Sequence, residues 1–108
     1  MLTNIGNFAF NEINEENSPT KTLLSFDLKK VDIQKATRVF ETGFQFYDIK
    51  IANSAKLEQN NTYLLRSVFE DKERASGFTK VDVIFAFRVL KIENEFVTLA
   101  WKKVSLKD

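Results

Sequence analysis

The sequence contains neither histidine nor cysteine, and this double absence narrows the chemistry that the chain can perform. Histidine is the side chain that titrates near neutral pH, and cysteine supplies thiolate nucleophiles and metal ligands. A Ser-His-Asp triad is therefore excluded, and so is a scaffold held together by disulfide bonds. Without cysteine, the sequence gives no indication of the redox state of its compartment.

Glycine and long apolar runs are also scarce. The three glycines, Gly6, Gly43 and Gly77, are far apart, so the chain has no glycine-rich loop for binding phosphate. The apolar runs are much shorter than the roughly 20 residues that span a bilayer. The first residues lack the basic segment and long apolar segment of a secretory signal. We therefore expect a cytoplasmic protein without a membrane segment.

Aromatic residues, in contrast, are abundant. Phenylalanine, tyrosine and tryptophan make up 13% of the 108 residues, and eleven of these residues are phenylalanines. This aromatic content supplies burial energy for an ordered core, and the length fits one domain, residues 1–108. The 16 basic and 15 acidic side chains nearly cancel, which leaves a net charge of +1. Strong long-range attraction to nucleic acid or to an anionic membrane is therefore not expected.

Alternation of apolar and polar residues predicts extended structure near the start of the chain. We expect one strand from Ile5 to Ile13 and a second from Lys21 to Lys30. The polar stretch Asn14 to Thr20, which contains Pro19, is expected to be the loop between them.

The middle of the chain fits more than one structure. Asp32 can cap a short helix that reaches Phe40, but an extended segment from Thr37 to Ile51, bent at Gly43, fits equally well. From Phe44 onward the alternation favours a strand, with Phe44 and Phe46 facing opposite to Ile49 and Ile51.

The segment from Asn53 to Gly77 fits a helical stripe as well as an alternating strand. We favour a strand from Thr62 to Phe69, because its neighbours are predicted strands. In addition, Asp71 and Glu73 would lie unfavourably near the negative C-terminal end of a helix.

The end of the chain predicts a hairpin that is apolar on both faces. Lys80 to Ile92 and Glu95 to Leu106 flank Glu93 and Asn94, which can form a two-residue turn. This turn would place Ala86 opposite Trp101. One face then carries Val81, Val83, Phe85, Phe87 and Val89, and the other carries Ile84, Ala86, Leu90, Leu99 and Trp101. Such a hairpin must be covered on both faces, unless its second face is a binding surface.

The best candidate for a binding site combines aromatic and basic side chains, and we call it the aromatic-basic set. Its members are Tyr47, Lys50, Arg88, Trp101, Lys102 and Lys103. Aromatic rings that stack on bases, beside cations that contact phosphates, are typical of single-strand binders. Strand alternation divides the set, however, because Trp101 and Lys102 face opposite ways, and rings of this kind are more often core residues.

Carboxylates offer little support for an enzyme. Asp27, Asp48 and Asp82 lie beside apolar residues in predicted strands, and alternation predicts that they face solvent rather than form a catalytic pair. The acidic turn from Glu93 to Glu95 is too short to indicate a metal site. We therefore expect no catalytic residues, no cofactor and no metal.

Together these patterns predict a mainly β fold, a small antiparallel β-barrel or sandwich of about five to seven strands with room for one short helix. The expected function is that of a non-enzymatic binding module. It would engage a protein partner, or self-associate, through an apolar β-surface or a strand edge. The alternative is a small nucleic-acid-binding β-barrel that uses the aromatic-basic set.

Overall fold

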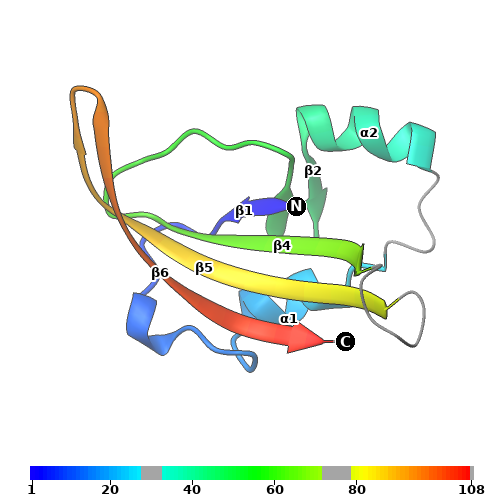
Figure 1. The fold of residues 1–108 in the computed structure, drawn as a ribbon. Coiled ribbons are helices and arrows are strands. Elements are labelled where there is room, and N and C mark those ends of the chain that lie inside the picture. Colours follow the sequence, from blue (N-terminus) through cyan, green and yellow to red (C-terminus); the bar gives the residue numbers. More distant parts are fainter. Residues whose placement is uncertain (28–32, 72–78, 108) are drawn as a thin grey trace.

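The computed structural model describes residues 1–27, 33–71 and 79–107. Its strands form a four-stranded antiparallel sheet in the order β1-β4-β5-β6 and a separate two-stranded hairpin (Figure 1). The strands of the sheet are β1 (Leu2–Asn4), β4 (Thr62–Asp71), β5 (Thr79–Glu93) and β6 (Phe96–Lys107), and the hairpin consists of β2 (Phe44–Phe46) and β3 (Ile49–Ile51). The prediction of a mainly β fold is confirmed. The sheet is not closed into a barrel, because β1 and β6 remain its two edges.

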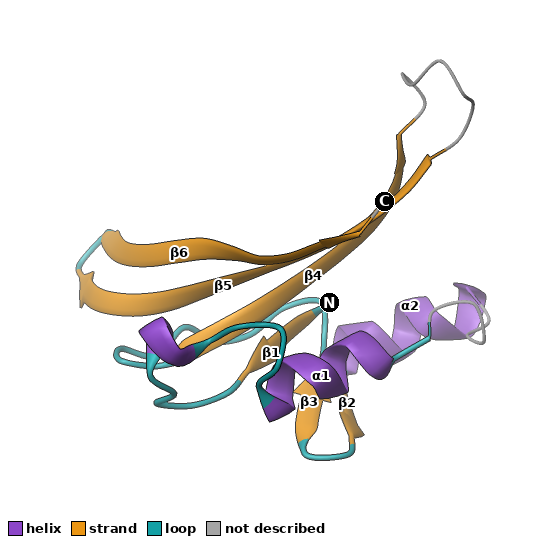
Figure 2. Ribbon diagram, turned by 90° about the horizontal axis from the view of Figure 1, so that it is seen from below, coloured by secondary structure: helices purple, strands orange, loops and turns teal. Residues whose placement is uncertain are grey.

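The helical elements are α1 (Ser18–Ser25), α2 (Ile33–Thr42) and a single 3₁₀ turn, η1 (Phe10–Glu12). The described chain thus holds more helix than the one short helix expected. Figure 2 shows all of these elements, together with the β2-β3 hairpin, on one side of the four-stranded sheet. We call that side of the sheet the covered face. Within the described ranges, no helix is long and apolar enough to cross a membrane.

The two strands predicted before residue 31 are wrong over the residues that the structure describes, and the end of the second, residues 28–30, lies outside them. Strand β1 ends at Asn4, and the segment from Lys21 to Ser25 belongs to helix α1. Pro19 lies in the first turn of α1, where a missing backbone N–H costs nothing and the fixed φ angle favours a helix. Thr20 and Leu23, three residues apart, are the buried positions of the helix, so a helical period overrides the apparent alternation.

Of the two alternatives for the next segment, the helix is correct. Helix α2 ends at Thr42, and Gly43 follows it with a φ angle of +80°. The Gly43 N–H donates to the Val39 carbonyl over 2.8 Å, which satisfies one of the last carbonyls of the helix. The expected cap at Asp32 lies outside the described residues.

The strand predicted from Phe44 onward is a hairpin instead. Tyr47 has a φ angle of +54°, and the chain reverses there, so that Phe44 pairs with Ile51 and Phe46 with Ile49. The two phenylalanines therefore lie on the same face as the two isoleucines, and not opposite to them. Both rings pack against Phe26, with ring centroids 5.4 Å and 5.2 Å away.

The strand predicted from Thr62 to Phe69 is confirmed as part of β4, and the terminal hairpin is confirmed as β5 and β6. Its turn lies one residue later than predicted, at Asn94 and Glu95, where Asn94 has a φ angle of +41°. An extra residue, Leu90, also interrupts the pairing of β5 with β6. Trp101 consequently lies opposite Phe87 rather than Ala86.

The elements α1, α2, η1 and the β2-β3 hairpin form a layer that we call the helical layer. The hydrophobic core lies between this layer and the covered face of the sheet. Its buried members are Ile13, Leu23, Phe40, Ile49, Ile51, Leu64, Ile84 and Ala86. Burial also affects the N-terminal amino group of Met1, which donates to the Arg66 carbonyl over 3.0 Å. Desolvation, followed by repulsion from the Arg66 guanidinium, lowers the pKa of this amino group below its ordinary value of 8.0.

Arg66 ties the helical layer to the sheet. Its guanidinium binds Asp82 on β5 through two hydrogen bonds of 2.9 Å and 2.7 Å. It also donates to the carbonyls of Leu23 and Phe26 at the end of α1, over 2.8 Å and 2.7 Å. One buried cation therefore satisfies both the carboxylate and the terminal carbonyls of the helix.

Candidate functional site

The side of the sheet that faces away from the helical layer is the candidate functional surface, and we call it the open face. Direct cross-strand partners project to the same side of a sheet, so the pairing of the strands identifies its members. They include Leu2 and Asn4 on β1, Tyr63, Leu65, Ser67 and Phe69 on β4, Val81, Val83, Phe85, Phe87 and Val89 on β5, and Leu99, Trp101, Lys103 and Leu106 on β6. No helix or strand of the described chain covers this face (Figure 2). The segment between β3 and β4 contacts it at Tyr63, which is fully buried and whose hydroxyl donates to the Lys56 carbonyl.

Large apolar side chains on the open face are exposed to solvent. Trp101 is 69% exposed, and Phe69 and Leu106 are each 50% exposed. Leu65 and Leu99 are also exposed, whereas the valines of the central strand are buried. Single exposed apolar residues are normal, but a contiguous group of this size on a monomer indicates an interaction surface.

The open face is ordered by contacts between its rings. The Trp101 ring meets the Phe85 ring edge-on at a centroid distance of 6.0 Å. Phe87 stacks on Tyr63 at 5.0 Å, and the Tyr63 hydroxyl donates to the Lys56 carbonyl over 2.8 Å. These contacts fix the rings in place, so a partner would lose little side-chain entropy when it binds them.

Charge is sparse on the open face. Among the open-face residues whose side chains the structure describes, Lys103 carries the charge, and Asn4, Tyr63 and Ser67 carry neutral polar groups. Lys103 lies opposite Phe85 on the edge strand β6 and is exposed. The surface is therefore apolar with one cation near its margin.

The structure places two members of the aromatic-basic set on the open face. Trp101 and Lys103 lie on the open face, while Lys102 projects to the covered face, with its ammonium 5.0 Å from the centre of the Phe10 ring. Tyr47 is 81% exposed at the turn of the β2-β3 hairpin, which lies in the helical layer. The set does not form one surface.

Arg88, another member of the set, binds parts of its own chain on the covered face. Its guanidinium donates to the Phe8 carbonyl over 2.7 Å, to Oδ1 of Asn7 over 2.6 Å and to Oγ1 of Thr62 over 3.2 Å. These bonds hold the segment that follows β1 against the sheet. The Arg88 side chain is thus occupied by contacts within the chain.

Sequence reasoning missed the open-face residues Leu65, Phe69 and Leu106 as site residues. Their signal was present, because the sequence predicts a terminal hairpin with two apolar faces. Without the structure, however, nothing indicated which of the two faces the helices cover.

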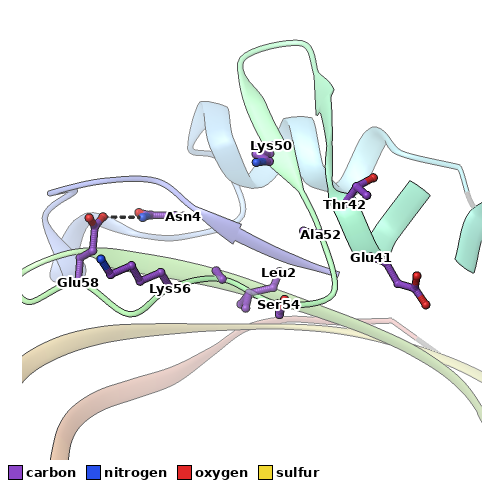
Figure 3. Close-up of a pocket in the computed structure, with 10 residues that line it drawn as sticks. Leu2, Asn4, Glu41, Thr42, Lys50, Ala52, Ser54, Lys56 and Glu58 are labelled. Carbon is purple, nitrogen blue, oxygen red and sulfur yellow. Dashed lines mark hydrogen bonds between the residues drawn. The ribbon is translucent and has the colours of Figure 1, made fainter. Parts of the chain in front are cut away.

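A shallow pocket of about 400 Å³ is a second candidate site. Lys50 of the aromatic-basic set lines it, together with Glu41, Lys56 and Glu58 (Figure 3). Glu58 accepts hydrogen bonds from Asn4 over 3.4 Å and from Asn61 over 2.9 Å. Two acidic and two basic side chains balance each other here, so the pocket does not select ligands by the sign of their charge.

Metal binding has no candidate among the residues that the structure describes, because no three acidic side chains there are grouped closely enough to hold an ion. No family model, curated protein or solved structure matches this chain.

Proposed function

We propose that this chain is a non-enzymatic binding module that engages a protein partner through the open face. The observation that supports this proposal is the exposure of Trp101, Phe69 and Leu106 on one uncovered side of the sheet. Burying apolar surface stabilises a complex by roughly 25 cal/mol per Å², and tryptophan is among the residues that contribute most to protein interfaces.

The charge distribution favours a protein over a nucleic acid. Phosphate binding needs several cations on one surface, and the affinity depends on how many phosphates they neutralise. The open face presents Lys103, whereas Arg88 and Lys102 lie on the covered face and contact the chain itself. An apolar surface with one marginal cation suits an apolar protein surface better than a phosphate backbone.

Nucleic-acid binding is the second candidate, and one observation favours it. Trp101 is exposed on the same side of β6 as Lys103, two residues away, which is the pairing of a stacking ring with a cation. Titration of a fluorescent single-stranded oligonucleotide at two salt concentrations tests it. Tight binding at physiological salt that Lys103→Glu abolishes would replace a protein partner with nucleic acid as the preferred function.

Site-specific photo-cross-linking tests the preferred function directly. A benzophenone amino acid is placed at Trp101, or at Tyr47 as a control, and the protein is irradiated in the cells that naturally produce the chain. Tyr47 is a suitable control because it is also an exposed aromatic residue but lies in the helical layer. Nuclease digestion of the adducts, followed by mass spectrometry of the cross-linked peptides, then identifies their class.

We expect a discrete adduct from position 101 that withstands nuclease and contains peptides of a second protein chain, and none of the same size from position 47. A nuclease-sensitive adduct would point to nucleic acid. An absence of any adduct from position 101, or the same adducts from both positions, would contradict a protein-binding role for the open face.

A further inference from the structure

The area of the open face matches half of a protein interface of standard size. A large aromatic side chain has roughly 150–250 Å² of surface, and with the exposed fractions of Trp101, Phe69 and their aliphatic neighbours this gives about 600 Å². Two such faces pressed together would bury about 1,200 Å², at the lower end of the roughly 1,200–2,000 Å² of specific complexes. An area of this size suits a reversible dimer.

The composition of the open face resembles the inner face of a β-sandwich. Its middle row runs from Lys103 through Phe85 to Leu65, and the next row runs from Trp101 to Phe87 and ends at Tyr63, which the chain itself buries. When two sheets pack face to face, about 10 Å apart, rows of aromatic and branched side chains from each sheet interdigitate. A lone sheet with helices on one side leaves this inner face without its partner layer.

The small net charge of the chain allows a second copy of it to supply the missing partner layer. The net charge is +1, so two copies repel one another only weakly. Lys103 lies on the edge strand β6, where a long side chain reaches the margin of an interface and keeps its ammonium in water. Among the open-face side chains that the structure describes, Lys103 carries the charge, so no second charge would have to be buried there.

Pairing of two β6 edges is a less suitable route to a dimer. Edge strands are commonly protected by lysine and by β-bulges. Strand β6 carries adjacent lysines, Lys102 and Lys103, and its pairing with β5 shifts by one residue beside them. Two antiparallel β6 edges would bring these cations near one another and leave both open faces exposed.

We propose that the open face binds the open face of a second copy of this chain, so that two sheets form one β-sandwich. This inference rests on the proposed protein-binding function and identifies its partner. The sandwich expected from the sequence would then form between two chains rather than within one.

The experiment uses the purified full chain and has two readouts. Sedimentation equilibrium from low micromolar to submillimolar concentration should show the mass rising toward about 25 kDa, twice the 12.5 kDa of one chain. Trp101 is the only tryptophan, so its fluorescence reports on the open face alone. Its emission should shift to shorter wavelength over the same concentrations, because the exposed ring becomes buried.

Two variants test the assignment of the surface. Trp101→Lys and Leu106→Lys each place a cation in the apolar contact and should weaken dimerisation at least about thirtyfold, as expected for the loss of an interface hot spot. Leu106→Lys keeps the tryptophan as a reporter. Tyr47→Lys removes an equally exposed aromatic residue from the helical layer and should leave dimerisation unchanged. Far-ultraviolet circular dichroism verifies that each variant is folded.

Three results would overturn the proposal: a wild-type chain that stays at 12.5 kDa throughout, lysine variants that both dimerise normally, or a Tyr47→Lys variant that dissociates equally. The first result would leave the broader protein-binding function intact if the cross-linked adduct from position 101 contains a different protein. An absence of protein adducts would remove that function as well, so the two failures are distinguishable.

Discussion

Replacing Arg66 by methionine should cost a large part of the stability of this protein. The substitution keeps the volume of the buried stem but removes the guanidinium, and with it two bonds to Asp82 and one each to the carbonyls of Leu23 and Phe26. Asp82 would then keep its charge in a largely buried place without a cation beside it.

The magnitude follows from the burial of the pair. Removing one partner of a buried ion pair costs about 3–5 kcal/mol, because the remaining charge is poorly solvated. The Asp82 side chain is partly exposed and recovers some hydration, so we expect about 3 kcal/mol for Arg66→Met. That is a substantial fraction of the roughly 5–15 kcal/mol that stabilises a typical domain.

Urea unfolding, followed by circular dichroism, measures this loss as a lower midpoint at an unchanged slope. Arg38→Met is the matched control, since Arg38 is exposed on α2 and its replacement should change stability by less than about 0.5 kcal/mol. The double variant Arg66→Met with Asp82→Leu should regain much of the loss, because both charges leave the core together. A loss below about 1 kcal/mol for Arg66→Met would refute the anchoring role of this side chain.

Three further predictions concern local features. Gly43→Ala should lower the urea midpoint more than Gly6→Ala, since both have positive φ angles but only at Gly43 would a Cβ meet side chains, at 2.8 Å and 3.2 Å. Lys102→Ala should lose about 0.5–1 kcal/mol in thermal unfolding through its contact with a phenylalanine ring of η1, while Lys103→Ala should be nearly neutral. The lowered pKa of the Met1 amino group means that protonation disfavours the folded state. The free energy of unfolding should therefore rise with pH up to about 8, and acetylation of the amino group should remove this dependence.

The sequence predicted the strands best at the end of the chain, where two long apolar segments flank a short turn. Strand β4 was favoured over a helix because its neighbours were predicted strands and because Asp71 and Glu73 would lie unfavourably at a helix C-terminus. Short segments failed, since Lys21 to Ser25 alternates over few residues and the helical contacts of Thr20 and Leu23 prevail there.

The candidate surface was only partly predictable. The sequence indicated that the terminal hairpin has two apolar faces and that one of them can bind a partner. It grouped Trp101 with Ala86, whereas the structure groups Trp101 with Phe85 and Phe87. The members of the aromatic-basic set do not share one surface, because Lys102 and Arg88 project to the covered face.

The sequence by itself determined the strand alternation and the near-neutral charge, because both are local or additive properties of the residues. Only the tertiary structure decided which residues share the open face. The extra residue Leu90 shifts the pairing of β6 with β5 by one residue. Because side chains alternate with a period of two, this shift moves the next β6 side chains beyond it, including Trp101, to the opposite side of the sheet relative to their β5 neighbours. Whether a strand accommodates such a residue depends on the packing of its neighbours, and this information is not contained in the pattern of any single segment.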